Sequence, residues 1–159
     1  MAINPTGKVP AVLHGAALVT EQAAIYSYLA DLYPEAGLAP GLTDPLRGPY
    51  LRWMMYYTSC FEPAVIDRAQ KREPAPVGMS PYGDFDTTLK TLTDQLTIGP
   101  HMRGERFTAL DTLWGTALGW TTKFGLVQVT PVIELDLERI HQRLSIAKMR
   151  AKGAELTRN

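Results

Sequence analysis

The sequence predicts a mainly α-helical protein in which an all-α bundle follows a short β-β-α segment. Two brief apolar runs flank a glycine before residue 20, a pattern typical of a β-hairpin. From residue 25 onward, apolar residues recur at spacings of three and four, which is the period of a helix. Proline- and glycine-rich stretches divide this region into segments of helix length.

The N-terminal segment begins with a turn and continues as a hairpin. Asn4-Pro5 and Gly7 predict the turn, because these residue types favour turn geometry. The first strand is expected over Val9 to Leu13, the tight turn at His14-Gly15, and the second strand over Ala16 to Val19.

A first helix should follow the hairpin. Thr20 is the expected N-cap, and Glu21 lies in the first turn, where acidic side chains are favoured. Pro34 should end this helix and begin a connector rich in proline and glycine. The expected domains are therefore a partial one over residues 1–40 and an all-α one over residues 45–151, with a tail over 152–159.

The second domain is expected to consist of helices. They should cover residues 46–69 and 85–96, a stretch starting at 108, residues 131 to about 143, and a short last segment to about 151. Pro63 should kink or break the first of these, because proline lacks an N–H and clashes with the preceding turn. Thr108 and Asp111 have the spacing of a capping box at the start of a central buried helix. Gly115 and Gly119 in that helix would let a neighbouring helix approach closely.

Composition argues against several classes of function. Sixteen basic and sixteen acidic residues cancel, so we expect neither a nucleic acid nor a membrane as partner. The single cysteine, Cys60, fits a reducing compartment, and no apolar stretch approaches the ~20 residues of a membrane span, so a cytoplasmic location is expected. None of the three histidines has a Cys or His neighbour at ligand spacing, so no metal site is expected.

Taken together, these segments resemble a cytosolic glutathione S-transferase. The N-terminal part of the resemblance is carried by NPTGKVPAVLHGAALVTEQAAIYSYLADLYPEAGLAP, residues 4–40. The helical part is carried by YLRWMMYYTSCFEPAV, similar to the family's first long helix, and by GERFTALDTLWGTALGW, similar to its loop and capped central helix. The resemblance runs from about Ala2 to Lys148.

The resemblance implies that residues 1–40 are a β-β-α remnant of a thioredoxin-like domain. In the family, a β-α-β unit precedes the segment that matches NPTGKVP and carries the Tyr, Ser or Cys that stabilises the glutathione thiolate. No catalytic residue can therefore be carried over to this sequence, and the chain as given is expected to be weakly active or inactive.

The resemblance also implies half of a glutathione site. The proline matching Pro10 is cis in the family, and the backbone of the residue matching Val9 pairs with the cysteinyl part of glutathione. Without the resemblance, a trans proline opening a strand is the commoner structure. Glu21 and Gln22 match the acidic-Ser pair that holds the γ-glutamyl end, with Gln22 departing from the usual serine. The alternative is a plainly capped helix with Gln22 in solvent.

Two functions remain open at this stage. In the first, the full-length form conjugates the thiolate of glutathione, a co-substrate rather than a bound cofactor, to a hydrophobic electrophile, and Tyr57 is the candidate contact for that second substrate. Aromatic residues at helical spacing, such as Trp53, Tyr56, Tyr57 and Trp114, more often form a core or a dimer interface. In the second, the chain is a non-catalytic assembly module of the same family. A homodimer is expected, with part of Leu46 to Phe61 in its interface.

Overall fold

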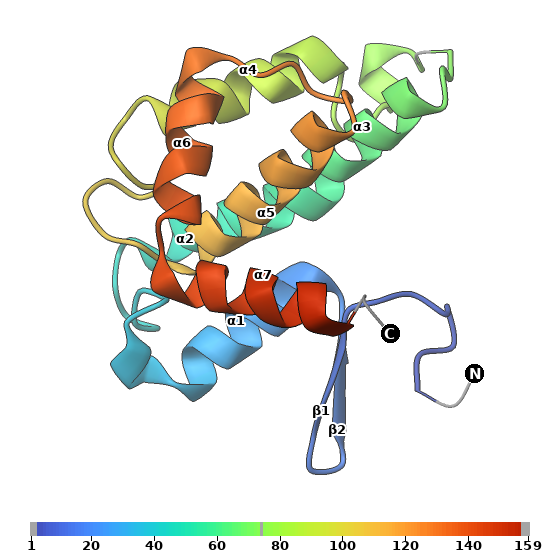
Figure 1. Cartoon of the computed structure of the whole chain (residues 1–159). Helices are drawn as coiled ribbons and strands as arrows, with labels where there is room; N and C mark the ends of the chain where they lie inside the picture. The colour runs from blue at the N-terminus through green and yellow to red at the C-terminus, as the bar shows by residue number, and fades with distance from the viewer. Residues whose placement is uncertain (1–2, 74, 157–159) are drawn as a thin grey trace.

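The computed structural model describes residues 3–73 and 75–156, and it confirms a mainly α fold that begins with a β-β-α segment (Figure 1). The elements are β1 (Ala11–His14), β2 (Ala17–Thr20), α1 (Gln22–Leu32), η1 (Pro34–Ala36), α2 (Arg47–Tyr56), η2 (Tyr57–Phe61), α3 (Glu62–Ala69), η3 (Val77–Met79), α4 (Phe85–Leu96), α5 (Ala109–Lys123), α6 (Pro131–His141) and α7 (Leu144–Leu156). The last helix continues past the predicted end near residue 151. None of the helices formed by the described residues combines the length and the apolar character that a bilayer crossing requires.

The hairpin forms as predicted, with its turn one residue later. The Gly7 N–H donates to the Asn4 carbonyl at 3.0 Å, which closes the expected turn before β1. The two strands are antiparallel, with Ala11 opposite Thr20. Gly15, at φ 59°, and Ala16 form the connection between the strands. Figure 1 shows the hairpin projecting away from the helices, so both of its faces are largely open.

The prediction that Thr20 caps α1 is wrong. Thr20 stays in β2, and Glu21 is the N-cap instead, with φ 68° and ψ 121° and no side-chain capping bond. The chain therefore changes from strand to helix within one residue. That change requires a positive φ, which costs a non-glycine residue roughly 1–3 kcal/mol.

The predicted helix over residues 46–69 is one rod with a change of hydrogen-bond register in its middle. A π-helical turn, η2, joins α2 to α3, and Pro63 lies in the first turn of α3. Because proline cannot donate to the carbonyl four residues earlier, the wider turn accommodates it without ending the rod. The hydrogen-bond register therefore changes just before Pro63, but the predicted break does not occur and the helix continues.

Helix α5 is the centre of the bundle and contacts α1, α2 and α6. Trp114 of α5 is fully buried, and its ring meets those of Trp53 and Phe61 edge to face, at centroid distances of 5.9 and 5.2 Å. The capping box is confirmed: Asp111 Oδ2 accepts the Thr108 N–H at 2.7 Å, and the Thr108 hydroxyl accepts from the start of the helix. The buried Asp111 also accepts the Met102 N–H at 2.8 Å, which ties the preceding loop to the helix.

Candidate functional site

All five residues predicted for the site line one small cavity of about 210 Å³ between the hairpin and the start of the bundle. The full lining is Asn4, Lys8, Val9, Pro10, Glu21, Gln22, Tyr57, Thr58 and Glu62. The cavity thus joins three segments that are far apart in the sequence: the loop before β1, the start of α1, and the π-helical turn with the residue after it.

The loop before β1 presents an unpaired stretch of backbone to this cavity. The Val9-Pro10 peptide is cis, as the resemblance implies, and Val9 is 90% exposed. Within the described residues, the Val9 N–H and C=O have no hydrogen-bond partner. The preceding residue is fixed, because the Asn4 side chain donates to the Lys8 carbonyl at 2.9 Å. An extended ligand could therefore pair with Val9 as a neighbouring strand would.

The start of α1 supplies free hydrogen-bond donors to the same cavity. The first N–H groups of any α-helix lack partners within the helix, and no side chain caps them here. This arrangement, with the positive end of the helix dipole, suits a carboxylate. Glu21, which is exposed, lines the same cavity and carries a negative charge. Together they match a group that carries both an anion and a cation.

Tyr57 lies mainly in the core and also lines the cavity. It is 8% exposed, and its ring meets that of Trp114 at 5.7 Å, edge to face. Its hydroxyl donates to Glu62 Oε1 at 3.2 Å. Burial, together with the nearby Glu62 carboxylate, raises the pKa of Tyr57 above its ordinary value. The phenol therefore stays protonated at neutral pH.

The other aromatic candidates lie elsewhere. Trp53 and Trp114 are buried in the core, and the Tyr56 hydroxyl donates to the Thr88 carbonyl at 3.3 Å. Neither cavity beside Tyr57 is lined by any of the three. They are structural residues of the bundle.

A second, larger cavity of about 680 Å³ adjoins the first. The two share five lining residues, Val9, Pro10, Gln22, Tyr57 and Glu62. The rest of the larger cavity is mostly apolar and comes from α1, η2, α3 and α5, with Ile25, Tyr26, Phe61, Val65, Ile66, Ala117 and Trp120 among its residues. The smaller, more polar cavity thus adjoins a mostly apolar one, and Tyr57 lines both.

Sequence reasoning missed four residues that line the 210 Å³ cavity: Asn4, Lys8, Thr58 and Glu62. Asn4 and Lys8 are within the NPTGKVP segment, where the pattern indicated a turn and gave no hint that Lys8 adds a cation to the site. Thr58 and Glu62 come from the long rod, and only the folded chain brings them beside the hairpin loop. Across residues 3–73 and 75–156, no three His, Cys, Asp or Glu side chains are grouped to hold a metal ion.

Comparison with known proteins shows what the chain is similar to. No protein-family profile matches it. The curated relative glutathione S-transferase GST-4.5 of Xanthomonas campestris pv. campestris is 29% identical over 136 residues, which cover 79% of this chain and 65% of the relative. The chain thus spans just under two thirds of that relative's length.

Two solved structures share the fold. The glutathione transferase from Methylococcus capsulatus has a TM-score of 0.78 at 30% identity, covering 96% of this chain and 77% of that one. A sphingomonad glutathione S-transferase complexed with glutathione has a TM-score of 0.75 at 29% identity, covering 95% and 77%.

Proposed function

Because the chain belongs to the glutathione transferase family, we propose that its 210 Å³ cavity binds glutathione. The whole protein would then transfer the glutathione thiolate to a hydrophobic electrophile held in the adjoining apolar cavity. The observation that carries this proposal is the convergence of Val9, Pro10, Glu21, Gln22 and Tyr57 on one cavity. The sphingomonad glutathione S-transferase, whose structure is a complex with glutathione, supports the same ligand.

The γ-glutamyl end of glutathione fits the start of α1. Its α-carboxylate would accept from the free N–H groups there, and Glu21 would hold its ammonium. The cysteinyl unit would pair with the Val9 backbone, whose N–H and C=O have no partner among the described residues. Lys8 then supplies a positive charge for the remaining carboxylate of the tripeptide.

The chemistry requires the thiol to lose its proton, because the thiolate is the nucleophile. Its sulfur forms a bond to the electrophilic carbon, and the leaving group departs with its bonding electrons. A hydrogen bond to the sulfur favours the thiolate at neutral pH. Tyr57 is not assigned this task, because its hydroxyl already donates to Glu62. A reducing cytoplasm is the compartment that suits this reaction.

A homodimer is part of the proposal. Leu51 and Met55, one turn apart on α2, are 38% and 47% exposed, while the opposite side of the helix is buried in the core. Such a face suits contact with a second copy. Light scattering on the parent and on Met55→Glu tests for the dimer. We expect the parent to be a dimer and the introduced glutamate to dissociate it. A parent that is monomeric at all concentrations contradicts the proposed dimer. The same face would serve a non-catalytic assembly module, and a conjugation assay on the whole protein separates the two functions.

Calorimetric titration with glutathione tests the binding site. Glu21→Gln keeps the shape and removes the charge, so we expect binding about ten- to a hundredfold weaker, which corresponds to roughly 1.5–3 kcal/mol for a charged hydrogen bond. Gln22→Ser should bind as well as the parent or better. Glu35→Gln is the matched control, since Glu35 is exposed and lies outside both cavities. Equal affinity of Glu21→Gln and the parent would show that this carboxylate does not hold the ligand.

A further inference from the structure

The 680 Å³ cavity that adjoins the proposed glutathione site has a negative charge on its wall, which comes from Glu62. Among the described residues that line this cavity, Glu62 is the only charged one, and none is Lys, Arg or His. The cavity thus has no positive group of its own that could pair with this carboxylate. Its volume is within the ~300–1,000 Å³ typical of small-molecule sites.

The Glu62 carboxylate has one oxygen free for a ligand. Oε1 accepts from the Tyr57 hydroxyl at 3.2 Å. Within the described part of the chain, Oε2 has no hydrogen-bond partner and Glu62 takes part in no salt bridge. Because Tyr57 holds one side of the carboxylate, the other side is available to a donor inside the cavity.

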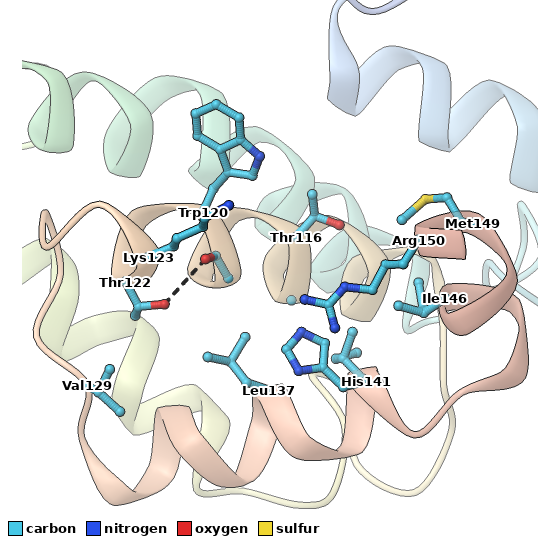
Figure 2. A pocket seen from close by; sticks show the side chains of 13 residues that line it. Thr116, Trp120, Thr122, Lys123, Val129, Leu137, His141, Ile146, Met149 and Arg150 are labelled. Atoms are coloured by element: carbon cyan, nitrogen blue, oxygen red, sulfur yellow. Dashed lines mark hydrogen bonds between the residues drawn. The ribbon is translucent and has the colours of Figure 1, made fainter. Parts of the chain in front are cut away.

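Aromatic side chains make up much of the remaining wall. Tyr26 comes from α1, Tyr57 and Phe61 from η2, and Trp120 from α5. Trp120 is 66% exposed, and Figure 2 shows its ring extending away from Leu137 of α6. The faces of aromatic rings attract organic cations, because the ring quadrupole is negative there. A carboxylate among aromatic rings therefore favours a ligand that is both apolar and positively charged.

We propose that this cavity selects hydrophobic electrophiles that carry a protonated amine, and that Glu62 is the residue that determines this preference. The inference rests on the proposed function, because it names the class of electrophile that the same cavity takes. The ammonium would donate to Glu62 Oε2 while the apolar body lies against the aromatic rings. The reacting carbon is elsewhere in the molecule, so the positive group stays unchanged when the sulfur forms its bond.

Other classes of electrophile are less complementary to this wall. An uncharged molecule leaves the carboxylate without a partner, and an anionic one is repelled by it. The charge therefore acts mainly as a filter on which hydrophobic molecules enter.

Three molecules with a similar phenylalkyl body test the charge preference: phenylbutylammonium, phenylbutanol and phenylbutyrate. Calorimetry on the 159-residue chain should show saturable binding of the ammonium, about fivefold weaker binding of the alcohol, and still weaker binding of the carboxylate. Glu62→Gln keeps the shape and removes the charge, so it should weaken ammonium binding about fivefold and leave alcohol binding unchanged. Glu35→Gln removes the same charge outside both cavities and should change neither.

A further variant shows which of the two cavities holds the ammonium, since Glu62 lines both. Tyr26 lines the larger cavity and not the smaller one, so Tyr26→Leu should weaken ammonium binding about threefold through the lost ring. The proposal is overturned if the ammonium does not bind, if the alcohol binds equally well, or if either Glu62→Gln or Tyr26→Leu binds the ammonium like the parent.

These titrations contain no glutathione, so the two proposals can fail separately. If glutathione binds and the ammonium does not, the charge preference is wrong and the glutathione site stands. If the ammonium binds through Glu62 and glutathione does not bind, the cavity is selective for cations and the transferase function is wrong.

Discussion

Replacing Gly115 with alanine tests how closely α5 and α6 pack. The new Cβ would lie 2.6, 3.0 and 3.1 Å from Ile140 Cγ1, Cγ2 and Cδ1, distances shorter than van der Waals contact. Overpacking of this kind costs roughly 1–3 kcal/mol. Alanine has a higher helix propensity than glycine, which by itself stabilises a helix interior by roughly 1 kcal/mol. The net expectation is a loss of about 0–2 kcal/mol in the free energy of unfolding.

Gly119 is the matched control on the same face of the same helix. Its Cβ would make an ordinary 3.7 Å contact with Leu137, so Gly119→Ala keeps the propensity gain without the clash. It should raise the free energy of unfolding by up to about 1 kcal/mol. Urea unfolding followed by circular dichroism measures both variants, which should differ by about 1–3 kcal/mol.

Ile140 identifies the cause of that difference. Ile140→Ala removes all three atoms that crowd Gly115, and in that background Gly115→Ala should become neutral or stabilising. The double-mutant cycle should therefore show a coupling energy between the two positions. If Gly115→Ala is as stable as Gly119→Ala in the parent, or if the cycle shows no coupling, the close approach of α6 is wrong.

Three further outcomes are expected. Thr108→Ala should lower the free energy of unfolding in urea by about 0.5–2 kcal/mol. Asp111→Ala should lower it more, because Asp111 also accepts from the loop N–H of Met102. The double variant should lose less than the sum of the two, and full additivity would argue against the reciprocal cap. Burial, together with the Asp111 charge, raises the pKa of Asp136 to about 6, above its value in the unfolded chain, so folding favours its protonated form. The stability that this group contributes is complete below about pH 4 and is lost as pH rises through 6, by at most roughly 3 kcal/mol. Asp136→Asn should remove that decline in the free energy of unfolding. A variant with the same pH profile as the parent would contradict the raised pKa. Glu21→Gly should raise the thermal midpoint, because glycine adopts φ 68° without strain, and should weaken glutathione binding; a lower midpoint would show that the side chain stabilises the fold.

Much of the fold could be predicted because its signals are local. The capping box, the helix over residues 85–96 and the hairpin depend on residues close together in sequence, and all three form as expected. For Pro63, the sequence predicted a disturbance of the helix but not its form, a π-helical turn through which the helix continues. Whether proline ends a helix or is absorbed by a π-helical turn depends on the packing of both halves, which the core around Trp114 fixes.

The site could be predicted only in part. The resemblance supplied Val9, Pro10, Glu21, Gln22 and Tyr57, and the structure brings them together. Local rules placed the α1 cap at Thr20, because they cannot anticipate that pairing with Ala11 holds this residue in the strand. The contribution of Glu62 depends on where a distant helix packs, and no spacing in the sequence encodes that.

The central claim is that glutathione occupies the cavity between Val9 and the start of α1. Amide chemical shifts recorded by ¹H–¹⁵N NMR during a glutathione titration test it most directly, because they report on each backbone N–H separately. The amides of Val9 and Gln22 should shift together and saturate. The amides of Gly119 on α5 and Ile146 on α7, which lie outside this cavity, should not shift. Saturable shifts confined to other regions, or none at Val9 and Gln22, would contradict the proposed site.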